Sequence, residues 1–598
     1  MGEVTTFFGL SLQIWLVIIM MIGLFYMLTR TRVPAEVSFL GAVTFLLAMG
    51  VISEHDLLEA FGSEAILVTG AFYIVLAGLM TTGVLYWLSK HLLGEPSTYS
   101  KAIVKLMAPA ALLSAMIGCL EVTHLFTDLV KIWARKLAIA PSKLLMPLSY
   151  AATLGGMCTL LGHTSNLVVA GLYVEQTGQA LNLFAPLIPG LVCTVVGIAL
   201  LAFLRNKIPP RESPEVSFEE TSDYTVELLV PTDNDAVMQT IDEAGLRNVS
   251  GGSLIEIVRF DKEVISPVPA DEYIFGGDRL IYSGQINELL ELKNTHGLVA
   301  ADHHVYSINE IDNNRKMRTA YVNFGSDLIG TRMCESDFEK RSDMVLVAVA
   351  RQGKRVDEQP RQVALQAGDT LLLECPSKRN TDLEMTYKRT LTFFDSQFVP
   401  QLGLRTVISA SILILMFMLS SFQVVPLITS TMLAAGAMLI FGCCRMDSIT
   451  KYIDLDFLLM LGAMMVFSTA ITKTGLMTMI SNPILKLCAE NPYIILIVMC
   501  FLASVVSELF SNLSAAAVFF PIMYHQAVIL GCNPLTFTIA LMTSITISYA
   551  TPVGSVTHMH IYGPGGFKFT DFLHLGTWMH LILLAVNLIT VIIVFPLH

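Results

Sequence analysis

The stretch SELFSNLSAAAVFFPI, residues 507–522, interrupts an apolar region with polar groups. It carries a carboxylate at Glu508, then a hydroxyl and an amide at Ser511 and Asn512, and ends in small residues before Pro521. In hydrocarbon every backbone N–H and C=O group must be paired, so irregular backbone is tolerated only where it lines a cavity or is buried in protein. The stretch is therefore either an irregular helix end or a break in the backbone that contacts a polar substrate.

The composition of the chain is that of a polytopic membrane protein. Of its 598 residues, 54% are hydrophobic and 14% are charged, and the mean hydropathy is +0.64. The net charge of −12 argues against nucleic acid as a partner. The ten cysteines include no C-x-x-C pair, which disfavours a zinc or disulfide framework. Because no Walker loop or dinucleotide-binding fingerprint occurs, we expect neither an enzyme nor an organic cofactor.

Apolar runs long enough to cross about 30 Å of hydrocarbon fall into two groups that flank a polar segment. The first group lies at 10–28, 34–52, 64–86, 143–161 and 181–204, and the second at 402–421, 424–443, 456–477, 535–553 and 571–597. The sequence therefore predicts a first membrane repeat at 1–204, a soluble insert at 205–395 and a second membrane repeat at 396–598.

The two membrane halves resemble each other. A shift of 392 residues places Thr82 on Thr474, Thr159 on Thr551 and Gly162 on Gly554. Repeats with polar interruptions at matched places are typical of secondary transporters.

The distribution of Lys and Arg predicts how the two membrane halves are oriented in the membrane. Lys and Arg occur in 29–32, 89–91 and 131–136 but not in 53–65 or 173–182. By the positive-inside rule, the first group and the insert face the cytoplasm. The pattern then requires a helix and a re-entrant hairpin at 102–132, and an odd number of crossings in each half. We therefore predict an all-α polytopic membrane fold with inverted repeats and re-entrant hairpins.

The insert contains an internal sequence repeat. A shift of 91 residues places Gly277 and Asp278 on Gly368 and Asp369, each pair just before an apolar run. Alternating apolar residues before these pairs are typical of half-buried strands. The insert is therefore expected to contain two small α+β modules, at 205–300 and 301–395.

The polar breaks suggest anion and cation chemistry. A broken helix exposes N–H groups, whose positive dipole end attracts anions, and frees carbonyl oxygens that suit Na⁺. Ser511 and Asn512 mark one hairpin tip, and Thr551 begins a break that faces it. The matching break in the first half is TLLGHTSN, residues 159–166.

Three segments of the membrane halves, together with the insert, resemble known protein families. The segments 142–172, 511–522 and 551–573 resemble the divalent-anion:sodium symporter family, and the insert resembles a tandem pair of TrkA C-terminal-type (RCK-C) modules. The resemblance implies a homodimeric elevator transporter in the inner (plasma) membrane of a bacterium. It would import a sulfate-like anion or a dicarboxylate with Na⁺, and the cytoplasmic insert, whose ligand is unknown, would regulate it.

The resemblance also assigns residues. The substrate-binding candidates are Thr164, Ser165, Asn166, Ser511, Asn512, Thr551, Pro552, Thr557 and His558. The Na⁺ candidates are Gly162, Asn166, Ser511, Asn512 and Gly554.

The first tip departs from the family pattern. Where Ser-Asn-Thr or Asn-Asn-Thr is expected, the chain has Gly118, Cys119 and Leu120, followed by the coupling candidates Glu121, His124 and Asp128. A carboxylate there would repel an anion, so Glu121 points elsewhere, is protonated, or serves a different substrate. The alternative function is a proton-coupled carrier or cation antiporter that uses Glu121 and Asp128, with transport that depends on pH through Glu121. A non-transporting sensor built on the insert is a third possibility.

Overall fold

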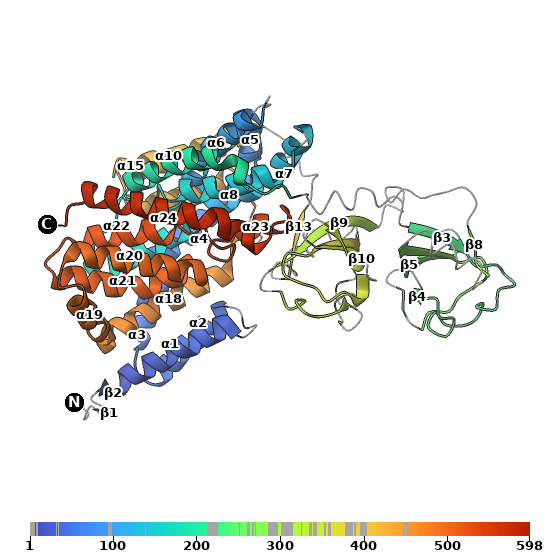
Figure 1. Ribbon diagram of the computed structural model, residues 1–598, viewed down its shortest axis with the longest axis horizontal. Helices are drawn as coiled ribbons and strands as arrows, with labels where there is room; N and C mark the ends of the chain where they lie inside the picture. Colours follow the sequence, from blue (N-terminus) through green and yellow to red (C-terminus); the bar gives the residue numbers. More distant parts are fainter. Residues whose placement is uncertain are drawn as a thin grey trace. The chain divides into compact units, whose positions relative to one another are not determined.

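In the computed structural model the chain divides into a helical unit and a unit of β-sheets (Figure 1). The helical unit comprises Met1–Pro210, Phe398–Ile561 and Lys568–His598, and the sheet unit comprises Arg211–Gln397 and Tyr562–Phe567. The structure describes residues 6–7, 10–30, 33, 35–93, 98–137, 139–211, 225–249, 252–259, 263–265, 268–269, 271–284, 297–300, 315–323, 326–333, 336, 338, 342, 344–351, 354–356, 360–376, 387, 390–394, 403–445, 449 and 452–597. Residue 301 and residues 395–396, where the sequence predicts domain boundaries, lie outside this set.

The first half of the helical unit begins with an apolar helix and contains a hairpin. Its helices are α1 (Leu12–Arg30), α2 (Ala35–Ala48), α3 (Glu54–Phe61), α4 (Glu64–Thr81), α5 (Val84–Leu93), α6 (Tyr99–Ile117), α7 (Cys119–Lys136), α8 (Ser142–Gly156), α9 (Thr164–Thr177) and α10 (Leu187–Leu204). The hairpin joins α6 to α7 at Gly118, whose φ of +105° is a conformation that side chains disfavour. The predicted hairpin at 102–132 thus corresponds to two complete helices.

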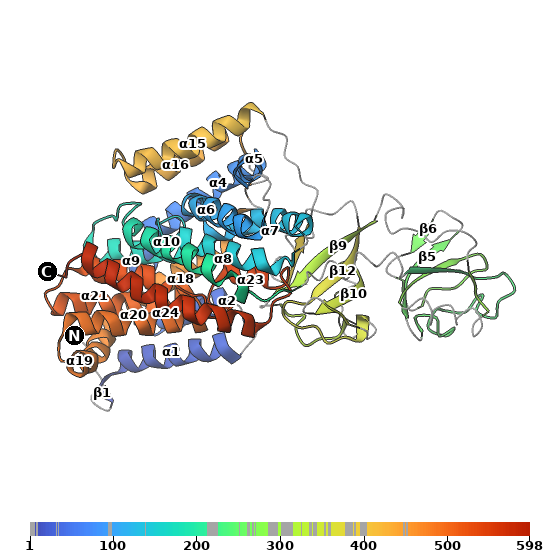
Figure 2. The same cartoon turned by 45° about the horizontal axis from the view of Figure 1, so that its top comes forward.

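The second half repeats the hairpin. Its described helices are α15 (Leu404–Ser421), α16 (Leu427–Ile440), α18 (Leu455–Thr474), α19 (Leu476–Leu487), α20 (Pro492–Leu509), α21 (Asn512–Ile529), α22 (Pro534–Ile545), α23 (Val556–Tyr562) and α24 (Phe569–Val594). Helices α20, α21 and α22 pack against one another, and α24 packs against α22. Figure 2 shows α20 and α21 side by side.

The helical unit has the surface of a multi-pass membrane protein. Seven of the described helical segments are long and apolar enough to cross a membrane: Glu54–Thr81, Leu187–Lys207, Leu404–Ser421, Leu455–Thr474, Pro492–Leu509, Asn512–Ile529 and Phe569–Val594. Large apolar side chains stand exposed on several helices, such as Phe203 at 81%, Ile440 at 83% and Trp578 at 64%. Patches of this kind favour a lipid environment over water.

Two of the predicted spans are shorter than expected. The runs 143–161 and 535–553 stop being helical at Gly156 and Ile545, because a polar segment follows in each case. The prediction of continuous crossings at these places is therefore wrong. The list of spans also omitted α20 and α21, whose apolar sequences form an 18-residue helix each.

The insert contains two antiparallel sheets that share the order of four strands, β5-β7-β3-β8 in one and β10-β12-β9-β13 in the other. The first has the order β4-β5-β7-β3-β8 with β6 beside β5, and the second has the order β11-β10-β12-β9-β13. The strands are β3 (Thr225–Leu229), β4 (Asn248–Val249), β5 (Gly252–Arg259), β6 (Glu263–Ile265), β7 (Arg279–Gly284), β8 (Val299–Ala300), β9 (Arg315–Val322), β10 (Val345–Arg351), β11 (Lys354–Arg355), β12 (Thr370–Pro376) and β13 (Leu391–Phe394). Each sheet covers its own apolar core.

An arginine–aspartate pair stabilises the same turn in both sheets. Arg259 donates to both carboxylate oxygens of Asp278 at 3.2 Å, and Arg351 donates to those of Asp369 at 2.8 and 2.7 Å. Each aspartate also accepts a backbone N–H from the residue three positions earlier. The Gly-Asp pairs seen in the sequence are therefore matching structural turns.

Candidate functional site

Two polar interruptions divide the helices of the membrane unit at equivalent places. We call them the first break, residues 157–163 between α8 and α9, and the second break, residues 546–555 between α22 and α23. Each break lies beside a hairpin, because α8 packs on α6 and α7, and α22 packs on α20 and α21. We call Gly118 and Cys119 the first tip, and Ser511 and Asn512 the second tip.

A threonine ties each break to its hairpin. Thr159 Oγ1 donates to the carbonyl of Ala115 at 2.6 Å and accepts the N–H of the glycine three residues later at 2.9 Å. Thr551 Oγ1 donates to the carbonyl of Glu508 at 2.6 Å and accepts the corresponding glycine N–H at 3.0 Å. The two arrangements are related by a shift of 392 to 393 residues, so both halves use one hydrogen-bond frame.

A serine one residue earlier in each hairpin makes a further hydrogen bond of the same kind. The hydroxyl of Ser114 donates to the carbonyl of Ala152, and the hydroxyl of Ser507 donates to the carbonyl of Ile545 at 2.7 Å. These bonds fix the last turn of α8 and of α22 against α6 and α20. No sequence pattern distinguishes these two serines from the other hydroxyl residues of the apolar helices, so their role is visible only in the structure.

The second tip reaches across to the first break. The side-chain amide of Asn512 is oriented so that its nitrogen faces acceptors and its oxygen faces a donor. The nitrogen donates to the carbonyl of Gly554 at 2.7 Å, and the oxygen accepts from His163 Nε2 at 3.1 Å. His163 Nδ1 is 2.8 Å from the hydroxyl of Ser165. The side chains of Asn512, His163 and Ser165 are all buried. His163 therefore joins the two halves, a role that the sequence analysis did not assign to it.

The first tip carries its own carboxylate. The N–H of Cys119 donates to the carbonyl of Gly162 at 3.1 Å, which seats the tip on the first break. The carboxylate of Glu121 lies over Gly118, where a side-chain Cβ would come within 2.3 Å of it. Glu121 is thus in the first turn of α7, where the helix dipole favours a negative charge.

The other coupling candidates lie further along α7. The ring of His124 contacts that of His560 at a tilt of 38°, with 3.6 Å between the ring centroids. Of Asp128 only the backbone, inside α7, belongs to the described part of the structure. The structure therefore places Glu121 at the tip and His124 against α23.

A second carboxylate occupies the second break. Glu508 accepts the N–H groups of Ala550 at 2.7 Å and Thr551 at 2.9 Å. Its Oε1 also lies 2.9 Å from His580 Nδ1. The sequence shows Glu508 as an isolated carboxylate but gives it no partner, and His580 is a single polar residue in an apolar part of α24 that no motif marks.

The remaining candidates of the second half face α8. The hydroxyls of Thr557 and Thr153 are 3.0 Å apart, and His558 Nδ1 is 2.6 Å from the hydroxyl of Ser149. Pro552 is buried in the break. These contacts bind the second break to α8, so Thr557 and His558 are held by protein partners.

Asn166 has an unsatisfied oxygen. Its amide nitrogen donates to the carbonyls of Thr159 at 2.8 Å and Gly156 at 3.4 Å. Its Oδ1 is buried and has no hydrogen-bond partner. A buried acceptor without a donor is costly unless a ligand supplies the missing interaction.

Two helix N-termini meet beside these groups. Helix α9 begins at Thr164, which is exposed, and α21 begins after Ser511, which is half-buried and accepts the N–H of Ser514. The two helices pack together, and neither has an acidic residue in its first turn. The positive ends of two helix dipoles and two hydroxyls therefore form a place suited to an anion.

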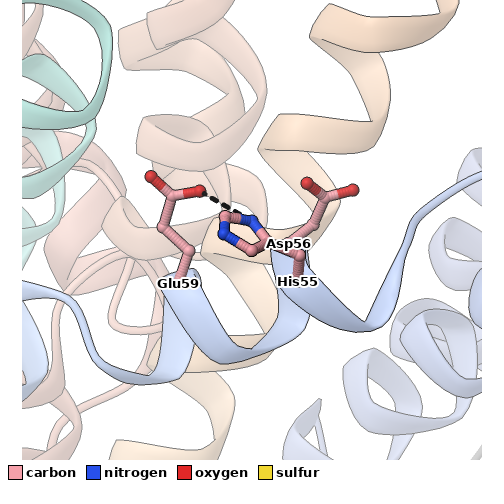
Figure 3. Close-up of side chains that lie close together, drawn as sticks. All are labelled: His55, Asp56 and Glu59. Carbon is pink, nitrogen blue, oxygen red and sulfur yellow. Dashed lines mark ion pairs between the residues drawn. The ribbon is translucent and has the colours of Figure 1, made fainter.

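A separate polar cluster lies on α3 (Figure 3). His55, Asp56 and Glu59 have ligand atoms within 4.8 Å of one another, and His55 Nδ1 is 3.6 Å from Glu59 Oε2. Asp56, however, accepts from Lys473 Nζ at 2.5 Å and from the N–H of Ser53 at 2.9 Å. Asp56 therefore anchors α3 to α18 and caps α3, which accounts for its burial without a metal.

The chain is similar to several known proteins. It is 25% identical over 97% of both chains to the uncharacterized transporter sll0640 of a Synechocystis strain. It is 27% identical to a putative sulfur deprivation response regulator of Chlamydomonas reinhardtii, over 92% of this chain and 96% of that one. Sodium/sulfate cotransporter 1 of the same alga is 25% identical over 60% of this chain and 43% of its own length.

Two further comparisons concern fold and family. The YdaH transporter of Alcanivorax borkumensis aligns over 97% of this chain and 96% of its own at 10% identity, with a TM-score of 0.42, too low to establish a common fold. Residues 15–429 and 413–597 match the family CitMHS, described as citrate transporter. The chain therefore belongs to the CitMHS citrate transporter family.

Proposed function

We propose that this chain imports a small anion, sulfate-like or a di- or tricarboxylate, together with Na⁺. The observation that carries the proposal is the meeting of the α9 and α21 N-termini, held together by the His163–Asn512 hydrogen bond. Thr164 and Ser511 add hydroxyl groups to this place, and no first-turn acid opposes an anion. The family and the sodium/sulfate cotransporter among the relatives support the same substrate class.

Hydrogen bonds within the protein reduce the number of candidate Na⁺ ligands. The carbonyls of Gly162 and Gly554 already accept from Cys119 and Asn512. Asn166 Oδ1 is buried without a partner, and a neutral oxygen of this kind is a suitable ligand for Na⁺. We therefore favour Asn166 as a Na⁺ ligand and the tips as the substrate contact.

The shared hydrogen-bond frame of the two breaks supports an inverted repeat, and with it the elevator movement and homodimer that the family resemblance implies. The basic flanks Arg205, Lys207 and Arg211 support a cytoplasmic insert at the bacterial inner membrane. Topology is tested by labelling a cysteine engineered into the insert: access from outside intact cells would contradict the proposed orientation.

A regulatory role for the RCK-C-like insert is supported by one segment. Residues Tyr562–Phe567, which follow α23, belong to the same compact unit as the second sheet. A Cβ at Gly368 would lie 2.8 Å from the ring of Tyr562, and one at Gly563 would lie 2.5 Å from the ring of Tyr321. The segment that leads out of α23 is thus held by the insert. Unregulated full flux after removal of 215–390 would weaken this part of the proposal.

The transport function is tested in proteoliposomes with labelled sulfate, succinate and citrate, with and without an inward Na⁺ gradient. We expect Na⁺-stimulated uptake of one of these anions, and a loss of roughly tenfold in apparent affinity for Thr164→Val, which removes a hydroxyl worth about 1.4 kcal/mol. Thr177→Val at the other end of α9 is the matched control. No uptake of any anion would contradict the proposal and favour a sensor.

A further inference from the structure

A buried carboxylate and a buried imidazole face each other between α20 and α24. Glu508 Oε1 and His580 Nδ1 are 2.9 Å apart, and both side chains are less than a tenth exposed. Ionisable groups inside a membrane protein are costly, and they persist where they are paired or functional. The pair lies at the second break, beside the proposed anion site but bonded to different atoms.

The partners of Glu508 are all hydrogen-bond donors. Its two oxygens accept the N–H groups of Ala550 and Thr551, and Oε1 also faces His580. Two backbone N–H groups stabilise the ionised form of a carboxyl group. The carboxylate thus takes the N–H groups that the second break would otherwise offer to an anion.

His580 has a carboxylate on one side of its ring and a hydroxyl on the other. Its Nδ1 faces Glu508 Oε1 and therefore carries a proton. Ser504 Oγ lies 2.9 Å from the carbonyl oxygen of Phe501 and 3.2 Å from His580 Nε2. A hydroxyl can accept from a protonated Nε2 or donate to an unprotonated one, so the surroundings of His580 accommodate both the charged and the neutral ring.

We propose that Glu508 and His580 form a proton-binding site that holds the second break in its transport-competent shape. With the proton bound, the pair is neutral and every polar atom in it is satisfied. When His580 loses the proton, the buried carboxylate faces a neutral ring. The negative charge of Glu508, which accepts the N–H groups of Ala550 and Thr551, is then no longer neutralised by a positive charge. Transport therefore responds to protons at this pair, not at Glu121 and Asp128.

In the described part of the structure, the other ionisable groups that face the pair are phenols and thiols. The phenols of Tyr150 and Tyr549 interact electrostatically with Glu508. Helices α10 and α20 add the thiols of Cys193 and Cys500, and α22 has no ionisable residue. Imidazole is the side chain whose ordinary pKa lies between pH 5 and 8. The two other imidazoles of the breaks, His163 and His558, are bonded to different partners.

The first test rests on the proposed transport function and measures uptake against pH. Wild-type uptake is expected to fall as pH rises, approaching about tenfold per pH unit, the limiting slope of one titrating group. His580→Gln should flatten this profile. His574→Gln is the matched control, because His574 lies on the same helix but is exposed. A His580→Gln profile that coincides with the wild type would overturn the proposal.

A second test does not need transport. The melting temperature of the purified full-length protein is measured from pH 5.5 to pH 9 for the wild type, His580→Gln and Glu508→Gln. The wild type is expected to lose stability as pH rises and the proton leaves, whereas both variants lose this component. Parallel curves for all three proteins would overturn the proton site. A wild-type curve that alone depends on pH, without uptake of any anion, would refute the transport function and leave the proton site standing.

Discussion

The two tips of the helical unit are held by the same hydrogen bonds between hairpin and break, but they carry different side chains. In both, a serine and a threonine hydroxyl bind the break to the hairpin, at distances that match within 0.1 Å for the threonines. The first tip then offers a glycine and a cysteine, and covers its helix N-terminus with Glu121. The second offers Ser511 and Asn512, whose amide reaches His163 in the other half.

This difference shows which contacts a duplicated site must retain. Hydroxyls that bond to backbone carbonyls define the shape of the break, and they are the same in both halves. Side chains at the tips can differ between the halves, because they do not form the hydroxyl hydrogen bonds that fix the backbone of the breaks. The first tip has become a support for the first break, whereas the second tip contacts both breaks.

The largest expected effect is at Asn512. Asn512→Ala removes two buried hydrogen bonds and leaves the carbonyl of Gly554 and His163 without their partner, which costs about 2–4 kcal/mol. Coupled uptake should be abolished, while the protein still folds and is extracted intact. The measurement is labelled-anion uptake in proteoliposomes, with size-exclusion chromatography as the check on folding.

Cys119→Ala is the control for this change, since Cys119 occupies the matching position in the first tip. Its contact with the first break is made by the backbone N–H, which alanine keeps. Uptake should stay within about twofold of the wild type, less than 0.5 kcal/mol. Normal uptake by Asn512→Ala, or equal losses in both variants, would remove the distinction between the tips.

The next effect concerns the shared frame. Thr159→Val and Thr551→Val each remove a buried hydroxyl that bonds a carbonyl and an N–H, so each should destabilise the protein by about 1–3 kcal/mol. Because the two arrangements match, the losses should be similar, as measured by thermal melting in detergent. A large loss in one half only would mean that the frame is functional in that half and incidental in the other.

The sequence was sufficient for part of this arrangement. Apolar run lengths and the matching Thr and Gly positions predicted two membrane halves and the location of both breaks. The Gly-Asp pairs of the insert predicted turns at the corresponding strand ends. These features are local, and their signal is a residue type at a fixed spacing.

The contacts between distant segments could not be predicted in the same way. His163 meets Asn512 over a separation of 349 residues, and His580 meets Glu508 over 72. Nothing in the spacing of either pair indicates contact, since helix packing brings them together. Thr551 and His558, which the family resemblance assigns to the substrate, contact Glu508 and Ser149 in the structure, and no spacing in the sequence indicates these partners.

The smallest expected effect is at Glu121. The carboxylate lies in the first turn of α7 and over Gly118, where its charge favours the helix N-terminus by about 0.3–1 kcal/mol. Glu121→Gln keeps a hydrogen-bond acceptor at this place and removes only the charge. Uptake should therefore change by less than about fivefold, and its dependence on pH should remain that of the wild type. The pH–uptake profile, compared with that of His580→Gln, decides whether protons act beside the first tip or at the Glu508–His580 pair of the second break. A profile that flattens in Glu121→Gln and persists in His580→Gln would reverse the comparison, because the proton site would then lie beside the first tip, and the Glu508–His580 pair would only support the second break.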